Sequence, residues 1–123
     1  GDGIMRFFIR FSDLIQPDLL ASVKEITNTI ESLYMEEGGR KINLDPGTLS
    51  DASLILATTK NRSHRIAIGR NLFAEVTLIY QNHSCISFPW TYADYRSEKV
   101  QKILLSYRSE LLAIRRKAAK TES

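Results

Sequence analysis

Four short runs of β-branched and aromatic residues follow one another in the middle of the chain, with only three or four residues between consecutive runs. The runs occupy residues 53–59, 64–68, 72–80 and 84–88. Such residues are typical of β-strands, and connections this short favour antiparallel pairing of neighbours. The sequence therefore predicts an antiparallel meander. Over residues 52–60 the alternative is a helix capped by Ser50 and Asp51, but Thr58 and Thr59 favour a strand.

An alternating segment and a helical segment precede the meander. Apolar residues at every second position over 5–11 predict a half-buried strand with a basic outer face. After Gln16, apolar residues recur at three- and four-residue spacing until a glycine pair at 38–39, which predicts a helix. Residues 41–45 are a further candidate strand, closed by a turn at 45–47.

A second helix is predicted at the end of the chain, beginning near Arg96. Its apolar positions form one stripe, made of Val100, Ile103, Leu104, Tyr107, Leu111 and Ile114. From the stripes of the two helices we predict four core residues, namely Ile26, Ile30, Ile103 and Leu104.

The expected element order is β-α-β-β-β-β-β-α, which is typical of an α+β domain. We expect an antiparallel sheet of about five to six strands with both helices on one face. With 123 residues, 43% of them hydrophobic and 25% charged, the chain fits one globular domain. We place this domain at residues 5–117, after an expression remnant at 1–4 and before a frayed tail at 118–123.

Several features bear on where the protein acts. No apolar run approaches the roughly 20 residues of a membrane-spanning helix, and the first residues do not form a signal peptide. A single Cys85 excludes an intramolecular disulfide. We therefore expect an intracellular protein of the cytoplasm, with the nucleus as an alternative.

Charge is distributed unevenly along the chain. Residues 96–120 carry eight of the seventeen Lys and Arg residues and only two acids, so this segment is +6 while the remainder sums to −3. Basic residues at a helix C-terminus complement the helix dipole, so a solvated helix end explains part of the pattern. The other interpretation is a contact with an acidic partner or a polyanion, made by Arg108, Arg115, Arg116 and Lys117.

Aromatic residues gather just before the last helix. Residues 88–95 hold four of the eleven Phe, Tyr and Trp residues. Trp90 and one tyrosine could cover the open end of the core, as amphipathic rings often do. Trp90, Tyr92 and Tyr95 could instead form a binding surface, because Trp and Tyr dominate interface energetics and also stack on unpaired bases.

Local signatures of catalysis are absent from the sequence. It contains no phosphate-binding glycine loop, zinc-peptidase, serine-hydrolase or dithiol motif. His64, His83 and Cys85 could in principle converge on a metal, but structural zinc usually takes four ligands. We therefore expect no enzyme activity, no metal and no cofactor.

The sequence thus favours a non-enzymatic protein-interaction domain of the adaptor, scaffold or inhibitor type. Its expected partner is another protein or a second copy of itself, docked through the aromatic cluster and the basic last helix. The alternative is a small nucleic-acid-binding domain in which the basic helix contacts phosphates, although a net charge of +3 is modest for that role.

Overall fold

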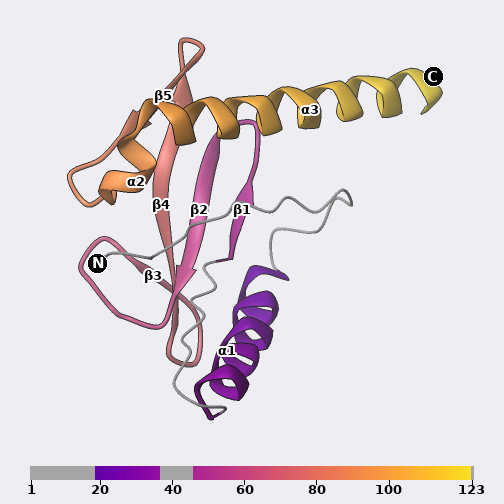
Figure 1. Ribbon diagram of the computed structural model, residues 1–123. Helices are drawn as coiled ribbons and strands as arrows, with labels where there is room; N and C mark the ends of the chain where they lie inside the picture. Colours follow the sequence, from indigo (N-terminus) through magenta and orange to yellow (C-terminus); the bar gives the residue numbers. More distant parts are fainter. Residues whose placement is uncertain (1–18, 37–45, 123) are drawn as a thin grey trace.

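The computed structural model describes residues 19–36 and 46–122, with the side chains of 19–33 and 46–117. Its elements are α1 (Leu20–Glu36), β1 (Gly47–Leu49), β2 (Ser53–Thr58), β3 (Ile66–Gly69), β4 (Leu72–Gln81), β5 (Ser84–Ser87), α2 (Ala93–Arg96) and α3 (Glu98–Glu122). The strands form one antiparallel sheet in the order β1-β2-β4-β3, and β5 also pairs with β4 (Figure 1). The predicted α+β class is confirmed. The predicted meander is wrong at one pairing, because β2 pairs with β4 and not with β3, its neighbour in the sequence. The strands predicted at 5–11 and 41–45 lie outside the described residues.

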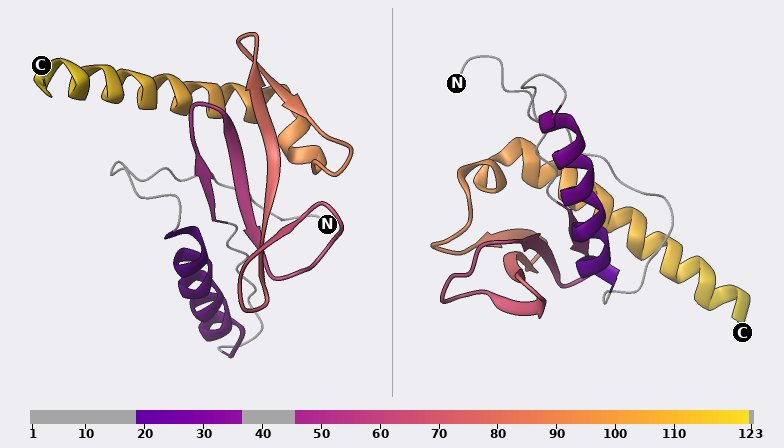
Figure 2. Two further views of the ribbon diagram at one scale, coloured as in Figure 1. Left: turned by 180° about the vertical axis from the view of Figure 1, so that it is seen from behind. Right: turned by 90° about the horizontal axis from the view of Figure 1, so that it is seen from below.

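Both long helices lie on the same side of the sheet, α3 across one end of it and α1 near the other (Figure 2). α3 continues well beyond the sheet towards the C-terminus (Figure 1). The helix predicted from Arg96 is interrupted at Ser97, whose backbone is extended, and α3 continues from there to Glu122.

Strand boundaries follow the sequence closely, except at β1 and at the start of β3. Residues 52–60 contain β2, so the strand interpretation is confirmed over the helical one. β3 starts at Ile66 rather than at residue 64. β1 starts at Gly47, where a turn was expected, and runs against β2. A side chain at Gly47 would force its neighbours to shift, because a Cβ there would lie 2.9 Å from the Ile55 carbonyl oxygen as well as 2.6 Å from Leu56 Cδ2.

The core lies between the sheet and α3. Its buried centre is Leu54 on β2, Leu78 on β4 and Leu104 on α3. Leu104 is 4% exposed, so its predicted core position is confirmed, and Ile103 beside it is partly buried. This contact fixes α3 to the sheet over its first half.

A β-bulge in β4 changes which side chains reach the interior. Leu54 pairs with Leu78 and Ile55 pairs with Val76, which leaves Thr77 as an extra residue. Bulges of this kind redirect side chains locally. As a result Thr77 and Leu78 are both fully buried although they are consecutive, and Glu75 is buried with them.

The face that α1 turns towards the sheet differs from the prediction. Leu20 and Lys24 are buried, whereas Ile26 and Ile30 are 60% and 37% exposed. The prediction that Ile26 and Ile30 belong to the core is therefore wrong. The physical reason is that α1 contacts β2 through the side of the helix that carries Leu20 and Lys24, which lies opposite Ile26.

Candidate functional site

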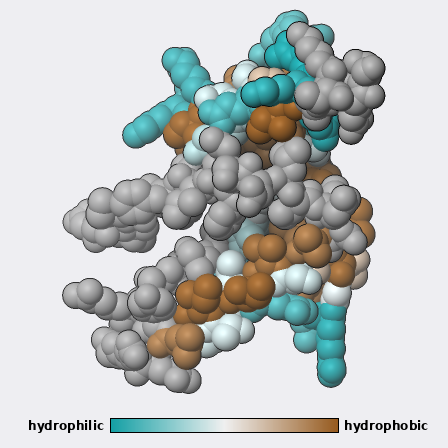
Figure 3. Space-filling view, turned by 90° about the vertical axis from the view of Figure 1, so that its right-hand side faces the viewer, coloured by the Kyte–Doolittle hydropathy of each residue, from teal (hydrophilic) through white to brown (hydrophobic). Residues whose placement is uncertain are grey.

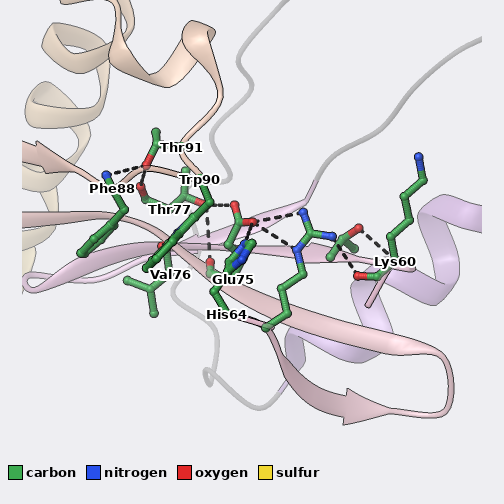
Figure 4. A network of polar contacts seen from close by, with 10 residues as sticks. Lys60, His64, Glu75, Val76, Thr77, Phe88, Trp90 and Thr91 are labelled. Atoms are coloured by element: carbon green, nitrogen blue, oxygen red, sulfur yellow. Dashed lines mark hydrogen bonds and ion pairs between the residues drawn. The ribbon is translucent and has the colours of Figure 1, made fainter. Parts of the chain in front are cut away.

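Trp90 is the middle ring of a stack of three. Its indole lies 4.5 Å from the His64 ring and 4.8 Å from the Phe88 ring, with interplanar angles of 12° and 9°. Figure 4 shows the indole between the other two rings. Its N–H donates to the carbonyl of Val76 at 2.9 Å. Both faces of Trp90 are therefore occupied by the chain itself.

Glu75 is the buried polar centre beside this stack, with a side chain that is 3% exposed. Its Oε1 accepts from His64 Nε2 at 2.7 Å and from Arg65 Nε at 3.1 Å. Its Oε2 accepts from the Thr77 hydroxyl at 3.2 Å. A buried carboxylate is costly unless it is paired and hydrogen-bonded, and here both conditions are met. Glu75 therefore joins β4 to the residues that precede β3 (Figure 4).

Thr91 closes the segment after the stack. Its hydroxyl donates to the Thr77 carbonyl at 2.7 Å and accepts from the Phe88 N–H at 2.9 Å. Arg96 holds the same segment from the other side, because its Nε donates to the Thr91 carbonyl at 2.8 Å and its Nη2 donates to the Phe88 carbonyl. These contacts fix the connection between β5 and α2 onto the bulged part of β4.

The predicted aromatic site thus separates into three different environments. Trp90 is partly buried and stacked on both faces, Tyr95 packs against the Leu54 cluster, and Tyr92 is 57% exposed. Only Tyr92 presents a ring to solvent that a partner could cover.

A pocket of about 540 Å³ lies between α1, β2 and the α2 segment. This size is ordinary for a small-molecule site, but such sites are mostly apolar. Here the lining carries both charge signs, including Lys24 and Arg65 as well as Glu75 and Asp94. The pocket therefore indicates no single class of ligand.

The predicted basic residues of α3 are also not equivalent. Arg108 donates from Nε to the Asp51 carbonyl at 2.8 Å, and its guanidinium lies 5.3 Å from the centre of the Tyr80 ring. Arg115 pairs with the Asp51 carboxylate at 3.4 Å, although both side chains are about half exposed. Arg116 and Lys117 are exposed. Arg108 and Arg115 thus hold α3 to the turn before β2.

The aromatic and basic residues do not form one surface. From Glu98, where α3 begins, to Arg115 there are 17 helical steps, or roughly 26 Å at 1.5 Å per residue. The composite surface predicted from the sequence would have to span that length of α3.

Burial affects two titratable groups beneath α3. Desolvation, together with the nearby Cys85, raises the pKa of Tyr80, while Arg108 lowers it. Desolvation also raises the pKa of Cys85, again opposed by Arg108. A raised pKa leaves the Cys85 side chain as a thiol near neutral pH, which does not suit a nucleophile.

An apolar stripe on α1 is the surface feature that the sequence interpretation missed. Its members share one side of the helix and are all exposed, namely Leu19, Ile26, Ile30 and Leu33. We call this set the α1 stripe. In the lower half of Figure 3, hydrophobic residues gather along the part of the surface formed by α1. Their three- and four-residue spacing is the available signal, but it predicts a core face as readily as an exposed one.

In the described part of the chain, no three His, Cys, Asp or Glu side chains gather in a way that could hold a metal ion. Within the same residues, no helix is long and apolar enough to cross a membrane.

The chain belongs to the family described as Domain of unknown function (DUF4416), whose model matches residues 1–111. That match includes α1, the whole sheet and α3 as far as Leu111. Neither a curated protein nor a solved structure matches the chain.

Proposed function

We propose that this protein is a non-enzymatic interaction domain that binds another protein chain through the α1 stripe. The observation that carries the proposal is the orientation of α1. The helix buries Lys24 against the sheet and exposes Ile26 and Leu33 at 60% and 59%. Monomeric proteins rarely leave a contiguous apolar surface uncovered without a use for it.

The proposed class of function, protein binding, is the one expected from the sequence. The proposed binding surface is different, because the α1 stripe replaces the aromatic cluster. Trp90 is poorly suited to bind a partner, because its N–H and both ring faces already make contacts within the chain. Aliphatic side chains on one helix face can instead enter a groove or pack on another helix. Burying one such side chain contributes about 1.5–3 kcal/mol. The single Cys85 supports a reducing, cytoplasmic setting for this interaction.

Nucleic-acid binding has weaker support. The exposed Arg116 and Lys117 could contact phosphates, but Trp90 has no free face on which a base could stack. Of the three aromatic residues in the predicted site, Tyr92 alone retains that capacity.

Photo-crosslinking from the stripe tests the proposal. A photoreactive residue at position 26, in cells that make the protein naturally, should give a discrete crosslinked species. The same residue at position 66 is the matched control, because Ile66 is 68% exposed and belongs to β3 rather than to the α1 stripe. Adding Leu33→Asp should remove the species from position 26.

A stability measurement accompanies the crosslinking. At a protein concentration low enough that association does not contribute to stability, the double variant Ile26→Asp with Leu33→Asp should keep the urea midpoint of the parent, since both side chains already face solvent. A loss above about 2 kcal/mol, typical of core substitutions, would place the stripe in the core and contradict the proposal. Crosslinking from position 26 that is no more specific than from position 66 would contradict it as well.

A further inference from the structure

The C-terminal half of α3 carries a surface that complements the α1 stripe. Ile114 is 39% exposed and follows Leu111 at three-residue spacing, so it continues the apolar side of α3 beyond the part that packs on the sheet. Lys117 lies three positions further along the same side, and Arg115 follows Ile114 directly. The C-terminal half of α3 therefore carries an exposed apolar position flanked by cations.

The stripe on α1 has the opposite electrostatic character. Within α1, Lys24 is buried towards the sheet, while Glu25 is exposed beside Ile26 at the edge of the stripe. Lys24 and Glu31 both line the pocket on the other side of α1, so among the described side chains Glu25 supplies the charge at the edge of the stripe.

On α3, Arg108 is held by Asp51 and the Tyr80 ring. The cations exposed beside Ile114 are Arg115, which also pairs with Asp51, and Lys117. The two surfaces are thus both apolar at the centre and opposite in charge at the edge.

The two surfaces of one chain do not meet each other. α1 and the C-terminal end of α3 lie far apart in every ribbon view (Figures 1 and 2). The stripe also faces away from the sheet, whereas α3 packs onto the sheet through Leu104. Pairing of the two surfaces therefore requires a second molecule.

We propose that the partner of the α1 stripe is a second copy of this chain, which places the Ile114 end of its α3 on the stripe. This inference rests on the proposed function and names its partner. In a two-fold dimer the contact is made twice, because each chain supplies one stripe and one α3 end. The doubling increases the buried apolar area and closes the assembly at two copies. Opposite charges at the edges fix the direction in which the two helices meet.

Sedimentation of the purified full chain across micromolar to submillimolar concentrations tests the inference. The expected species at high concentration has twice the 14.0 kDa mass of the chain. Ile26→Asp and Ile114→Asp should each weaken the dimer by about tenfold or more, because each removes an apolar contact that occurs twice. Ile66→Asp, an exposed position outside both surfaces, should leave the dimer unchanged.

A charge exchange tests which surfaces meet. Glu25→Lys and Lys117→Glu should each weaken the dimer by about two- to fivefold, as expected for exposed ion pairs. The two changes together should restore it. Arg116→Glu is the matched control, since a residue two positions from Ile114 points to the opposite side of the helix. Failure of the double variant to restore the dimer, or an equal loss with Arg116→Glu, would overturn the pairing of α1 with α3.

The two proposals can fail separately. A monomer at all concentrations, with a crosslinked species from position 26 heavier than two copies, would overturn the second-copy partner and retain the docking role of α1. A crosslinked species of twice the chain mass supports both. Ile26→Ser is measured beside Ile26→Asp, and both should lose the dimer while keeping the urea midpoint of the parent at a concentration where the parent is a monomer. A dimer that survives in both variants would overturn the inference.

Discussion

The indole of Trp90 lies almost parallel to the imidazole of His64, with 4.5 Å between ring centres and 12° between ring planes. The same imidazole contacts the Glu75 carboxylate at 2.7 Å. Trp90 is thereby linked to the buried polar centre of β4. The connection between β5 and α2 is thus held by aromatic stacking as well as by the hydrogen bonds of Thr91.

Replacement of Trp90 by Ala should destabilise the fold rather than selectively remove a binding contact. The variant loses two ring contacts and the hydrogen bond to the Val76 carbonyl. Because Trp90 is only partly buried, we expect a loss of about 2–3 kcal/mol, at or below the low end for a core tryptophan. Urea unfolding measures this loss.

Tyr92→Ala is the control for that experiment, since Tyr92 belongs to the same segment but is 57% exposed. It should change the free energy of unfolding by less than about 0.5 kcal/mol. Equal losses in the two variants would show that the stack contributes nothing particular to stability.

Removal of the Glu75 carboxylate should strongly destabilise the fold, because it leaves a buried cation without its partner. In Glu75→Ala, the guanidinium of Arg65 remains buried and loses its carboxylate partner. Breaking one side of a buried ion pair costs about 3–5 kcal/mol. Glu75→Gln keeps an acceptor for His64 and Arg65 at nearly the same volume, so we expect a smaller loss. Equilibrium unfolding of both variants checks the order, and a Gln variant as unstable as the Ala variant would contradict the explanation.

The strands were predictable because they carry their own signals. The segments of β2, β4 and β5 are rich in β-branched and aromatic residues. Their order in the sheet was not predictable, because short connections favour pairing of neighbours, whereas β2 pairs with β4 and leaves β3 on the far side of β4. The start of β3 was less predictable. His64 and Arg65 have ordinary strand neighbours in the sequence, but their side chains reach Glu75, ten or eleven residues away. The local sequence pattern does not predict a contact between side chains on different strands.

The candidate site was predictable only in part, for a similar reason. Periodicity identified the apolar side of α1 correctly, but it could not say whether that side faces the sheet or the solvent. The same ambiguity applies to Trp90, whose residue type suits both an interface and a stack. The bulge at Thr77, which buries Thr77 and Leu78 together, depends on the register of β2 and leaves no trace in the sequence.

Leu104→Ala and Ile26→Ala should separate two positions that looked equivalent in the sequence. Leu104 is 4% exposed and lies in the core cluster, so its truncation should cost about 2–5 kcal/mol. Ile26 is 60% exposed, and its truncation should cost less than about 1 kcal/mol. Thermal unfolding of the two variants at low protein concentration measures the difference without a contribution from association. A large loss of unfolding free energy for Ile26→Ala would show that Ile26 is buried, which is the orientation of α1 expected from the sequence.

Tyr80→Phe should stabilise the protein, most of all at alkaline pH. Among the described residues, the buried Tyr80 hydroxyl has no hydrogen-bond partner, and an unsatisfied buried polar group costs about 1–3 kcal/mol. Burial also raises the pKa of Tyr80 above that of the unfolded chain. The unfolded chain therefore loses this proton first as the pH rises, so the stability present at neutral pH declines above about pH 10. Phe keeps the ring beneath Arg108 and removes the ionisation.

Urea midpoints of Tyr80→Phe measured at neutral pH and near pH 10 should both be higher than those of the parent, and the increase should be larger at the higher pH. Tyr92→Phe, at an exposed ring, should change neither midpoint. A lower midpoint for Tyr80→Phe would show that the hydroxyl is satisfied and stabilising.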